Sequence, residues 1–240
     1  MQAELKKRIL RAACEPYRSI GISHHQWARG KMGFDPVFSG MVSHALIPDQ
    51  AVMLDLGCGR GFMASWLLSA ERVAAEGAWS GAGAPPRGVR FHGVELVADE
   101  VVAGNQALRP LHGDRVSLVA GDMRTAEIPP GVNVVTMFDV LHYVPHADQD
   151  RLLDRIRQGL TRGGLFITRV GDAQGGMPFR ISQIVDRFAS FVQGHRLSKM
   201  WCRPLSQWVQ ALEGRGFVVQ TLPMNEGTPF ANVLLVARVP

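Results

Sequence analysis

Short apolar runs alternate with longer segments of helical periodicity from residue 51 to the end of the chain. Short runs suit buried strands, and the longer segments repeat apolar residues at the spacing of one helix face. This alternation predicts an α/β fold with a doubly wound, mostly parallel sheet of seven strands. The expected strands are 52–56, 89–96, 116–120, 132–139, 164–170, 217–222 and 233–239. The expected helices are 61–74, 98–109, 148–160 and 204–215.

Two segments lie outside this alternation. Residues 75–88 are rich in Gly, Ala and Pro and predict a surface loop. Residues 172–203 follow the fifth strand and carry an amphipathic helical pattern over 178–192, whose apolar stripe is either core or a cover for the carboxyl ends of the strands. We therefore expect an N-terminal helical cap or lid, 1–49, and one domain, 50–240, with 172–203 as a substrate-covering insertion.

The first expected strand runs into the glycine-rich turn D-L-G-C-G-R-G-F at 55–62. Glycine permits positive φ and close approach of the backbone to a ligand because it lacks a Cβ. The dinucleotide fingerprint G-x-G-x-x-G occupies the same strand-turn-helix context. Phe62 stands where that fingerprint has its third glycine, and a bulky side chain there argues against a pyrophosphate site.

The turn D-L-G-C-G-R-G resembles the first motif of the class I S-adenosylmethionine-dependent methyltransferases. The resemblance covers about 50–170 and the last two strands, and it implies a Rossmann-like methyltransferase fold. S-adenosylmethionine would be the methyl donor and S-adenosylhomocysteine the product. In that family the last two strands form a hairpin that places the seventh, antiparallel, between the fifth and sixth, and the short connection 223–231 would allow it.

Acidic residues close three of the expected strands, and ligands of open α/β sheets lie beyond the carboxyl ends of the strands. Glu95 suits both ribose hydroxyls, because it follows the glycine turn at the expected spacing once the loop insertion is left out. For Asp122 the resemblance implies an acceptor for the adenine amino group, with Met123 beside the ring, although Gly-Asp is also an ordinary turn. Asp139 would face the amino-acid end or the sulfonium. The predicted cofactor residues are Asp55, Gly57, Cys58, Gly59, Gly61, Glu95, Leu96, Asp122, Met123 and Asp139.

Methyl transfer to a nucleophile is an in-line displacement, so positioning and exclusion of water supply much of the rate and no catalytic residue is obligatory. His142 is a candidate general base for a hydroxyl or an enolisable carbon, and Asp139 is a second catalytic candidate. The family also carries Leu-His at this place as part of the cofactor wall, so both interpretations of His142 stay open. Tyr143 is a candidate for substrate binding.

The segment S-H-H-Q-W-A-R-G-K-M-G-F-D-P-V-F, at 23–38, combines cations with aromatic side chains. It resembles a stretch of small methyltransferases encoded beside aryl-polyene and related pigment or fatty-acid clusters. The resemblance implies that Arg29 and Lys31 meet an acidic or phosphopantetheine-bearing substrate, in bacterial secondary metabolism. The apolar part of that substrate would be lined by Trp27, Phe34 and Phe38.

The positive charge lies in the flanks of the chain. Residues 1–50 and 172–240 each hold 7 basic and 4 acidic side chains, whereas 51–171 hold 12 and 13. Basic flanks near an active site favour an acidic substrate or an acyl carrier. Nucleic acid is disfavoured, since there is no dense basic run and no N-P-P-Y or D-P-P-Y motif after the fourth strand. An Arg-rich solvated surface explains the charge equally well.

Cysteine usage and hydropathy bear on the compartment. The three cysteines are scattered, without metal-like spacing, which suits a reducing cytoplasm and predicts no metal. No apolar run is long enough to span a membrane. The leading hypothesis is thus a cytoplasmic methyltransferase that acts at oxygen or carbon of a small, aromatic or carrier-bound acceptor. An NAD(P)-linked oxidoreductase and a non-catalytic S-adenosylmethionine-binding protein are the alternatives.

Overall fold

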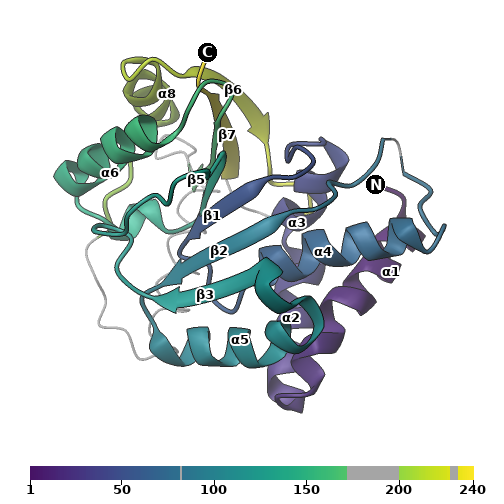
Figure 1. Ribbon diagram of the computed structural model, residues 1–240. Coiled ribbons are helices and arrows are strands. Elements are labelled where there is room, and N and C mark those ends of the chain that lie inside the picture. The colour runs from purple at the N-terminus through teal and green to yellow at the C-terminus, as the bar shows by residue number, and fades with distance from the viewer. Residues whose placement is uncertain (82, 172–199, 228–231) are drawn as a thin grey trace. The chain divides into compact units, whose positions relative to one another are not determined.

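The computed structural model describes residues 1–81, 83–171, 200–227 and 232–240 (Figure 1). They divide into two compact units, Met1–Ala126 and Glu127–Pro240. The helix expected at 178–192 lies outside the described residues. Within the described residues, no helix has both the length and the apolar character to cross a membrane.

The first unit combines the N-terminal helices with three parallel strands (Figure 1). Its strands are β1 (Val52–Leu56), β2 (Arg90–Glu95) and β3 (Val116–Ala120), in the order β3-β2-β1. Its helices are α1 (Ala3–Cys14), α2 (Ile22–Phe34), α3 (Pro36–Ser43), α4 (Phe62–Ala75) and α5 (Ala98–His112), with short 3-10 helices η1 (Glu15–Arg18) and η2 (Gly113–Arg115).

The N-terminal segment is helical, as predicted, and packs as core. The amphipathic helix α1 buries Leu5, Ile9 and Ala13 and packs against α4. Helix α3 begins where the side chain of Asp35 accepts a hydrogen bond from the backbone N–H of Val37, at 3.0 Å. An acidic N-cap of this kind satisfies a backbone donor that has no partner inside the helix.

The second unit holds the other strands. They are β4 (Val134–Phe138), β5 (Leu165–Gly171), β6 (Val218–Pro223) and β7 (Asn232–Arg238), in the order β4-β5-β7-β6. Among its described residues the helices are η3 (Leu141–Tyr143), α6 (His146–Gly159) and α8 (Leu205–Glu213). Strands β4 and β5 are parallel, whereas β7 is antiparallel to both β5 and β6, so the predicted place of the last strand is confirmed.

The seven expected strands and the α/β class are confirmed, and the strand ends differ from prediction by two residues at most. The largest difference in a helix is at α5, which was expected to end at 109 and continues to His112. Pro110 lacks the N–H that would donate to a carbonyl in the preceding turn. The helix continues past it only to His112, within its last turn. The chain leaves that turn at Gly113, whose N–H bonds to the carbonyl of Arg109.

Candidate active site

The glycine turn between β1 and α4 is built from left-handed backbone. Gly57, Gly59 and Gly61 have φ of 83°, 54° and 74°, a region that other residues rarely adopt. A Cβ on Gly61 would lie 2.8 Å from Cδ1 of Leu108, whereas a Cβ on Gly59 would have no heavy atom within 4 Å. Gly61 is therefore required by internal packing, and the open space beside Gly59 leaves room for a ligand.

Glu95 ends β2 with its carboxylate held by backbone. Its Oε2 accepts from the N–H of Gly59 at 2.9 Å, and its Oε1 accepts from the N–H of Val97 at 3.0 Å. Each carboxylate oxygen has capacity for a further hydrogen bond. The neighbouring Leu96 is 66% exposed, which is unusual for a large apolar side chain. Together they suit a ligand with paired hydroxyl groups and a flat apolar ring.

Asp122 and Met123 follow β3 and are half-buried. The Oδ1 of Asp122 accepts from the backbone N–H of Arg124 at 2.8 Å. Both carboxylate oxygens also accept from Nε of Arg124, at 3.0 and 2.8 Å. This local pair stabilises the turn that Gly-Asp favours. Contact of Asp122 with adenine stays a prediction.

Two further predicted cofactor residues are buried. Asp55 at the end of β1 is 4% exposed, and Cys58 in the glycine turn is 7% exposed. Burial raises the pKa of Cys58 well above its usual value, and the negative charges of Asp55 and Glu95 raise it further. The thiol is therefore neutral at pH 7 and serves the turn as a small packing group.

Asp139 follows β4 and is held by an arginine that sequence reasoning missed. Arg169 on β5 is only 3% exposed, and its Nε donates to Oδ1 of Asp139 at 2.9 Å while Nη2 donates to Oδ2. Such a two-pronged pair fixes the carboxylate and offsets its charge. Asp139 itself has φ of 58°, uncommon for a residue other than glycine. A charge inside the apolar run of β5 was the available signal.

His142 and Tyr143 lie on η3, just after Asp139. Their rings are 4.1 Å apart between centroids, and Tyr143 is 40% exposed. Burial lowers the pKa of His142, although the charge of Asp139 acts in the opposite direction. The imidazole is therefore neutral at pH 7, which is the form that a general base requires. The carbonyl of His142 accepts from the N–H of Trp201 at 2.8 Å.

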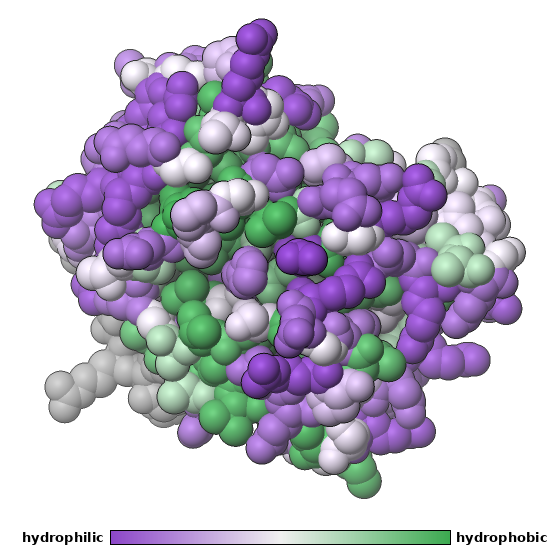
Figure 2. All heavy atoms as spheres, in the orientation of Figure 1, coloured by the Kyte–Doolittle hydropathy of each residue, from purple (hydrophilic) through white to green (hydrophobic). Residues whose placement is uncertain are grey.

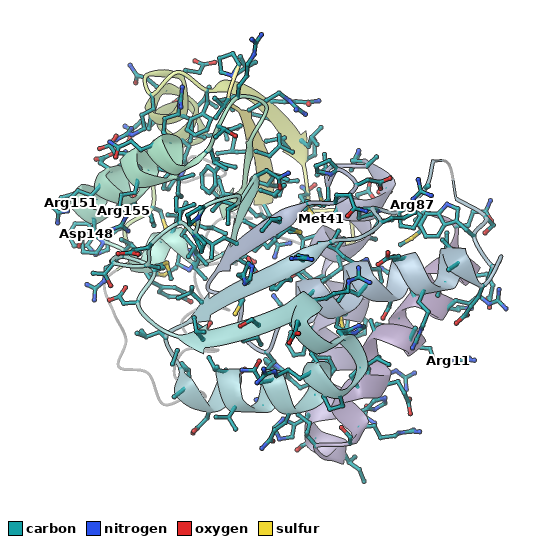
Figure 3. All side chains as sticks on the ribbon, viewed as in Figure 1. Arg11, Met41, Arg87, Asp148, Arg151 and Arg155 are labelled. Carbon is teal, nitrogen blue, oxygen red and sulfur yellow. The ribbon has the colours of Figure 1, made fainter. Side chains whose placement is uncertain are left out.

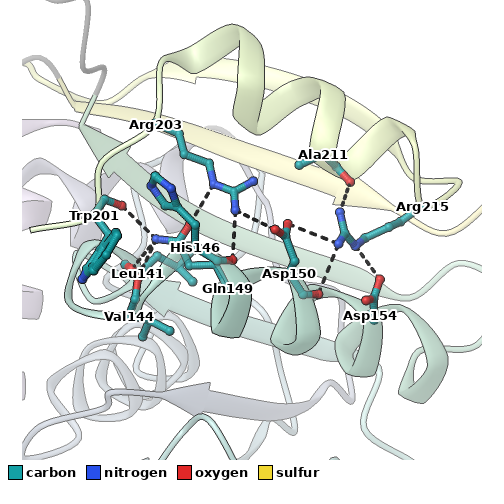
Figure 4. A network of polar contacts seen from close by, with 10 residues as sticks. All are labelled: Leu141, Val144, His146, Gln149, Asp150, Asp154, Trp201, Arg203, Ala211 and Arg215. Atoms are coloured by element: carbon teal, nitrogen blue, oxygen red, sulfur yellow. Dashed lines mark hydrogen bonds and ion pairs between the residues drawn. The ribbon is translucent and has the colours of Figure 1, made fainter.

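One buried amide joins this loop to the segment that precedes α8 (Figure 4). Gln149 on α6 is fully buried, and its Nε2 donates to the carbonyls of Leu141 (2.9 Å), Val144 (2.9 Å) and Trp201 (2.8 Å). Its Oε1 accepts from Nε of Arg203 at 2.8 Å. The loop after β4 and the chain around Trp201 thus share one anchor. Sequence reasoning missed it, because a lone glutamine in a helix carries no pattern.

Ion pairs extend the network along α6 (Figure 4). Nη2 of Arg203 donates to Asp150 at 2.9 Å, and its guanidinium lies 5.3 Å from the ring centroid of Trp208. Arg215 reaches Asp150 at 3.3 Å and Asp154 at 2.7 Å. A further ion pair lies on the same helix, where Arg151 pairs with Asp148 (Figure 3). Ion pairs with the carboxylates of α6 therefore account for part of the arginine content of the chain.

The two cations predicted to bind substrate lie on α2 in the first unit. Lys31 Nζ donates to Asp35 at 2.9 Å, an exposed pair within one helical turn. Arg29 is exposed. Substrate binding by Arg29, Lys31 and Tyr143 stays a prediction.

Of the three aromatic residues expected to line an acceptor site, one was wrongly assigned. Phe38 is 4% exposed and packs in the core, with its ring 5.9 Å from that of Trp66. Trp27 and Phe34 are 50% and 84% exposed. Figure 2 shows one face of the molecule, which is mainly hydrophilic and carries scattered hydrophobic patches. A partner could therefore reach Trp27 and Phe34, but not Phe38.

Comparison with known sequences identifies a domain. Residues 54–166 match the family model described as a methyltransferase domain. A carboxy-S-adenosyl-L-methionine synthase of Glaesserella parasuis serovar 5 (strain SH0165) is 31% identical over 129 residues, which are 53% of this chain and 48% of that protein. The chain spans about half the length of the curated relatives it matches.

Solved structures show the same fold. The mitomycin 7-O-methyltransferase MmcR is similar with a TM-score of 0.60 and 24% identity, over 89% of this chain and 56% of that one. The magnesium protoporphyrin IX methyltransferase ChlM from Synechocystis PCC 6803, solved with bound SAH, has a TM-score of 0.57 and 14% identity, over 90% and 87%. The predicted Rossmann-like methyltransferase fold is confirmed by these likenesses.

Proposed function

We propose that the chain is a class I S-adenosylmethionine-dependent methyltransferase, which transfers the methyl group of S-adenosylmethionine to a small acceptor and releases S-adenosylhomocysteine. The observation that carries this proposal is the carboxylate of Glu95, held by two backbone N–H groups beside a turn of left-handed glycines. The oxygens of that carboxylate have remaining capacity for the two ribose hydroxyls.

The residues around Glu95 fit the rest of the cofactor. The open space beside Gly59 would take the part of the ligand that passes the glycine turn, and Leu96 would lie against the adenine ring. The bound cofactor supplies an electrophilic methyl group on its sulfonium. The chain's residues orient the two reactants and exclude water, which supplies much of the rate of an in-line displacement.

We further propose that the acceptor atom is a hydroxyl oxygen or an enolisable carbon. His142 is neutral at pH 7, because burial lowers its pKa, and would accept the proton of the acceptor. The pairing of Asp139 with Arg169 leaves Asp139 less suited to act as a base, so its role would be to orient the site and to raise the basicity of His142. One structural neighbour, MmcR, is by name a 7-O-methyltransferase.

The acceptor class that we favour is aromatic or bound to an acyl carrier. The exposed side chains of Trp27, Phe34 and Arg29 support it, because they combine apolar area with positive charge on one helix. The three cysteines are free, which supports a location in the cytoplasm.

Isothermal titration with S-adenosylhomocysteine, S-adenosylmethionine and NAD tests the cofactor. We expect micromolar binding of the two sulfur ligands, weakened at least about tenfold in Glu95→Ala through loss of the ribose hydrogen bonds. Glu213→Ala, at an exposed site on α8, is the matched control and should bind as the unchanged protein does. Firm NAD binding without binding of either sulfur ligand would instead support an oxidoreductase.

Transfer itself is tested with S-adenosylmethionine labelled at the methyl group. Phenols and acyl carriers loaded with hydroxylated or β-keto acyl chains form the first acceptor panel, and His142→Gln is the variant. We expect labelled product from one class and a rate at least about a hundredfold lower in the variant. Cofactor binding without transfer to any member of the panel would favour a non-catalytic binding protein.

A further inference from the structure

Arg60, inside the glycine turn, is held by residues of the N-terminal segment. Its carbonyl accepts from the hydroxyl of Tyr17 at 2.9 Å, across 43 positions of sequence. Tyr17 lies on η1, is fully buried, and packs its ring 5.0 Å from the ring of Phe62. Burial raises the pKa of Tyr17 well above its usual value, so the hydroxyl keeps its proton and remains a donor.

The side chain of Arg60 is held as well. Its Nη2 and Nε donate to the two carboxylate oxygens of Glu100 on α5, at 2.7 and 2.8 Å. Its Nη1 lies 3.0 Å from Nδ1 of His24 on α2. A guanidinium only donates, so the ring nitrogen of His24 is the acceptor in this contact.

The hydrogen bond from Tyr17 also fixes the orientation of the peptide group that joins Arg60 to Gly61. A trans peptide is planar, so the carbonyl of Arg60 and the N–H of Gly61 point in opposite directions. That N–H donates to the carbonyl of Cys58 at 3.0 Å and closes the turn. The hydroxyl of Tyr17 thus sets one peptide plane in a turn whose glycines have several accessible conformations.

We infer that Tyr17 and His24 are positioning residues for the cofactor, because they hold Arg60 and with it the glycine turn in the geometry that accepts the ligand. The inference rests on the proposed function. It makes the N-terminal segment part of cofactor binding, although this segment precedes residues 54–166, which match the methyltransferase domain. A turn that occupies its binding geometry for only a tenth of the time binds about tenfold more weakly.

Titration of the full chain with S-adenosylhomocysteine tests the inference. Tyr17→Phe removes only the hydroxyl and should raise Kd about tenfold, and His24→Ala should raise it about threefold. Ser19→Ala is the matched control, because Ser19 also donates a hydroxyl to a backbone carbonyl, that of Pro16 at 2.8 Å, without reaching the turn. Its Kd should be unchanged.

The outcomes separate the two proposals. Absence of binding by the unchanged protein would refute the proposed cofactor, whatever the variants do. Binding by the unchanged protein with an equal Kd in Tyr17→Phe and His24→Ala would overturn the positioning role. A role in stability alone would lower the melting temperature of the ligand-free variants and leave Kd unaltered. His24 is half-buried at the start of its helix, so His24→Ala decides the matter if Tyr17→Phe does not fold.

Discussion

Gln149→Leu should strongly destabilise the protein, although it replaces one buried side chain by another of similar size. The amide of Gln149 supplies the donors for the carbonyls of Leu141, Val144 and Trp201, and the acceptor for Arg203. Leucine fills most of the same volume, so little of the effect would come from a cavity. The loss would come from polar groups that no longer have their partner.

The magnitude follows from counting those groups. The two amide hydrogens serve three carbonyls, so two hydrogen bonds of normal strength are lost, together with the one from Arg203. A buried acceptor without its donor costs about 1–3 kcal/mol. Arg203 keeps its bond to Asp150, and Trp201 is only half-buried, so water would offset part of the loss. We expect the free energy of unfolding to fall by about 3 kcal/mol.

Urea denaturation, with linear extrapolation to water, measures this free energy. Asp154→Asn is the matched control in the same network, because it removes the charge paired with Arg215 at a carboxylate that is 52% exposed. Exposed ion pairs contribute little, so its effect should be below about 1 kcal/mol. Gln149→Glu separates the two halves of the anchor, since glutamate retains an acceptor for Arg203 but cannot donate when ionised.

The reasoning would be refuted if the free energy of unfolding of Gln149→Leu lay within about 1 kcal/mol of that of the unchanged protein. The comparison requires that this free energy fall equally steeply with urea concentration in both proteins. The reasoning would also be refuted in part if Gln149→Glu were as stable as the unchanged protein at pH 7. In that case the bond to Arg203, and not the donation to the carbonyls, would anchor the loop.

Three further predictions concern other parts of the fold. Gly61→Ala should lower the free energy of unfolding by about 1–3 kcal/mol, because alanine disfavours φ of 74° and its Cβ would meet Leu108 at 2.8 Å; an unaltered thermal midpoint would contradict this. Asp139→Asn should cost about 2 kcal/mol in urea denaturation by removing a charge partner from the buried Arg169, and equal stability would show that the pair is dispensable. Burial lowers the pKa of His112 to about 4, so the unfolded chain binds a proton there before the folded chain does, and stability should decline as pH falls from about 6.5 to about 4. Since His112 is partly exposed, His112→Gln should recover only about 1 kcal/mol at pH 5, and an identical pH dependence would exclude this group as the cause.

Local patterns were enough to predict most of the secondary structure. The apolar run of β1 and the three glycines after it predicted a strand and a turn of left-handed residues, and both are present. These features depend on neighbours in sequence, because a period of two or of 3.6 residues and a missing Cβ act within a few positions. Glu95 was predicted in the same way, from its place at the end of a strand.

Partners distant in sequence could not be predicted. Arg169 reaches Asp139 across 30 positions, Tyr17 reaches Arg60 across 43, and the amide of Gln149 reaches Trp201 across 52. With 22 arginines and 21 acidic residues, the chain offers many pairings of equal chemistry. Nothing in a side chain's identity selects one of them.

The sequence by itself determined the α/β class, the strands, the glycine turn and the acidic residue beside it. The tertiary structure decided that Phe38 packs in the core, that Asp139 is paired with a buried arginine, and that Tyr17 reaches the glycine turn. The physical reason is that backbone conformation responds to adjacent residues, whereas burial and pairing depend on which surfaces meet when helices and strands pack.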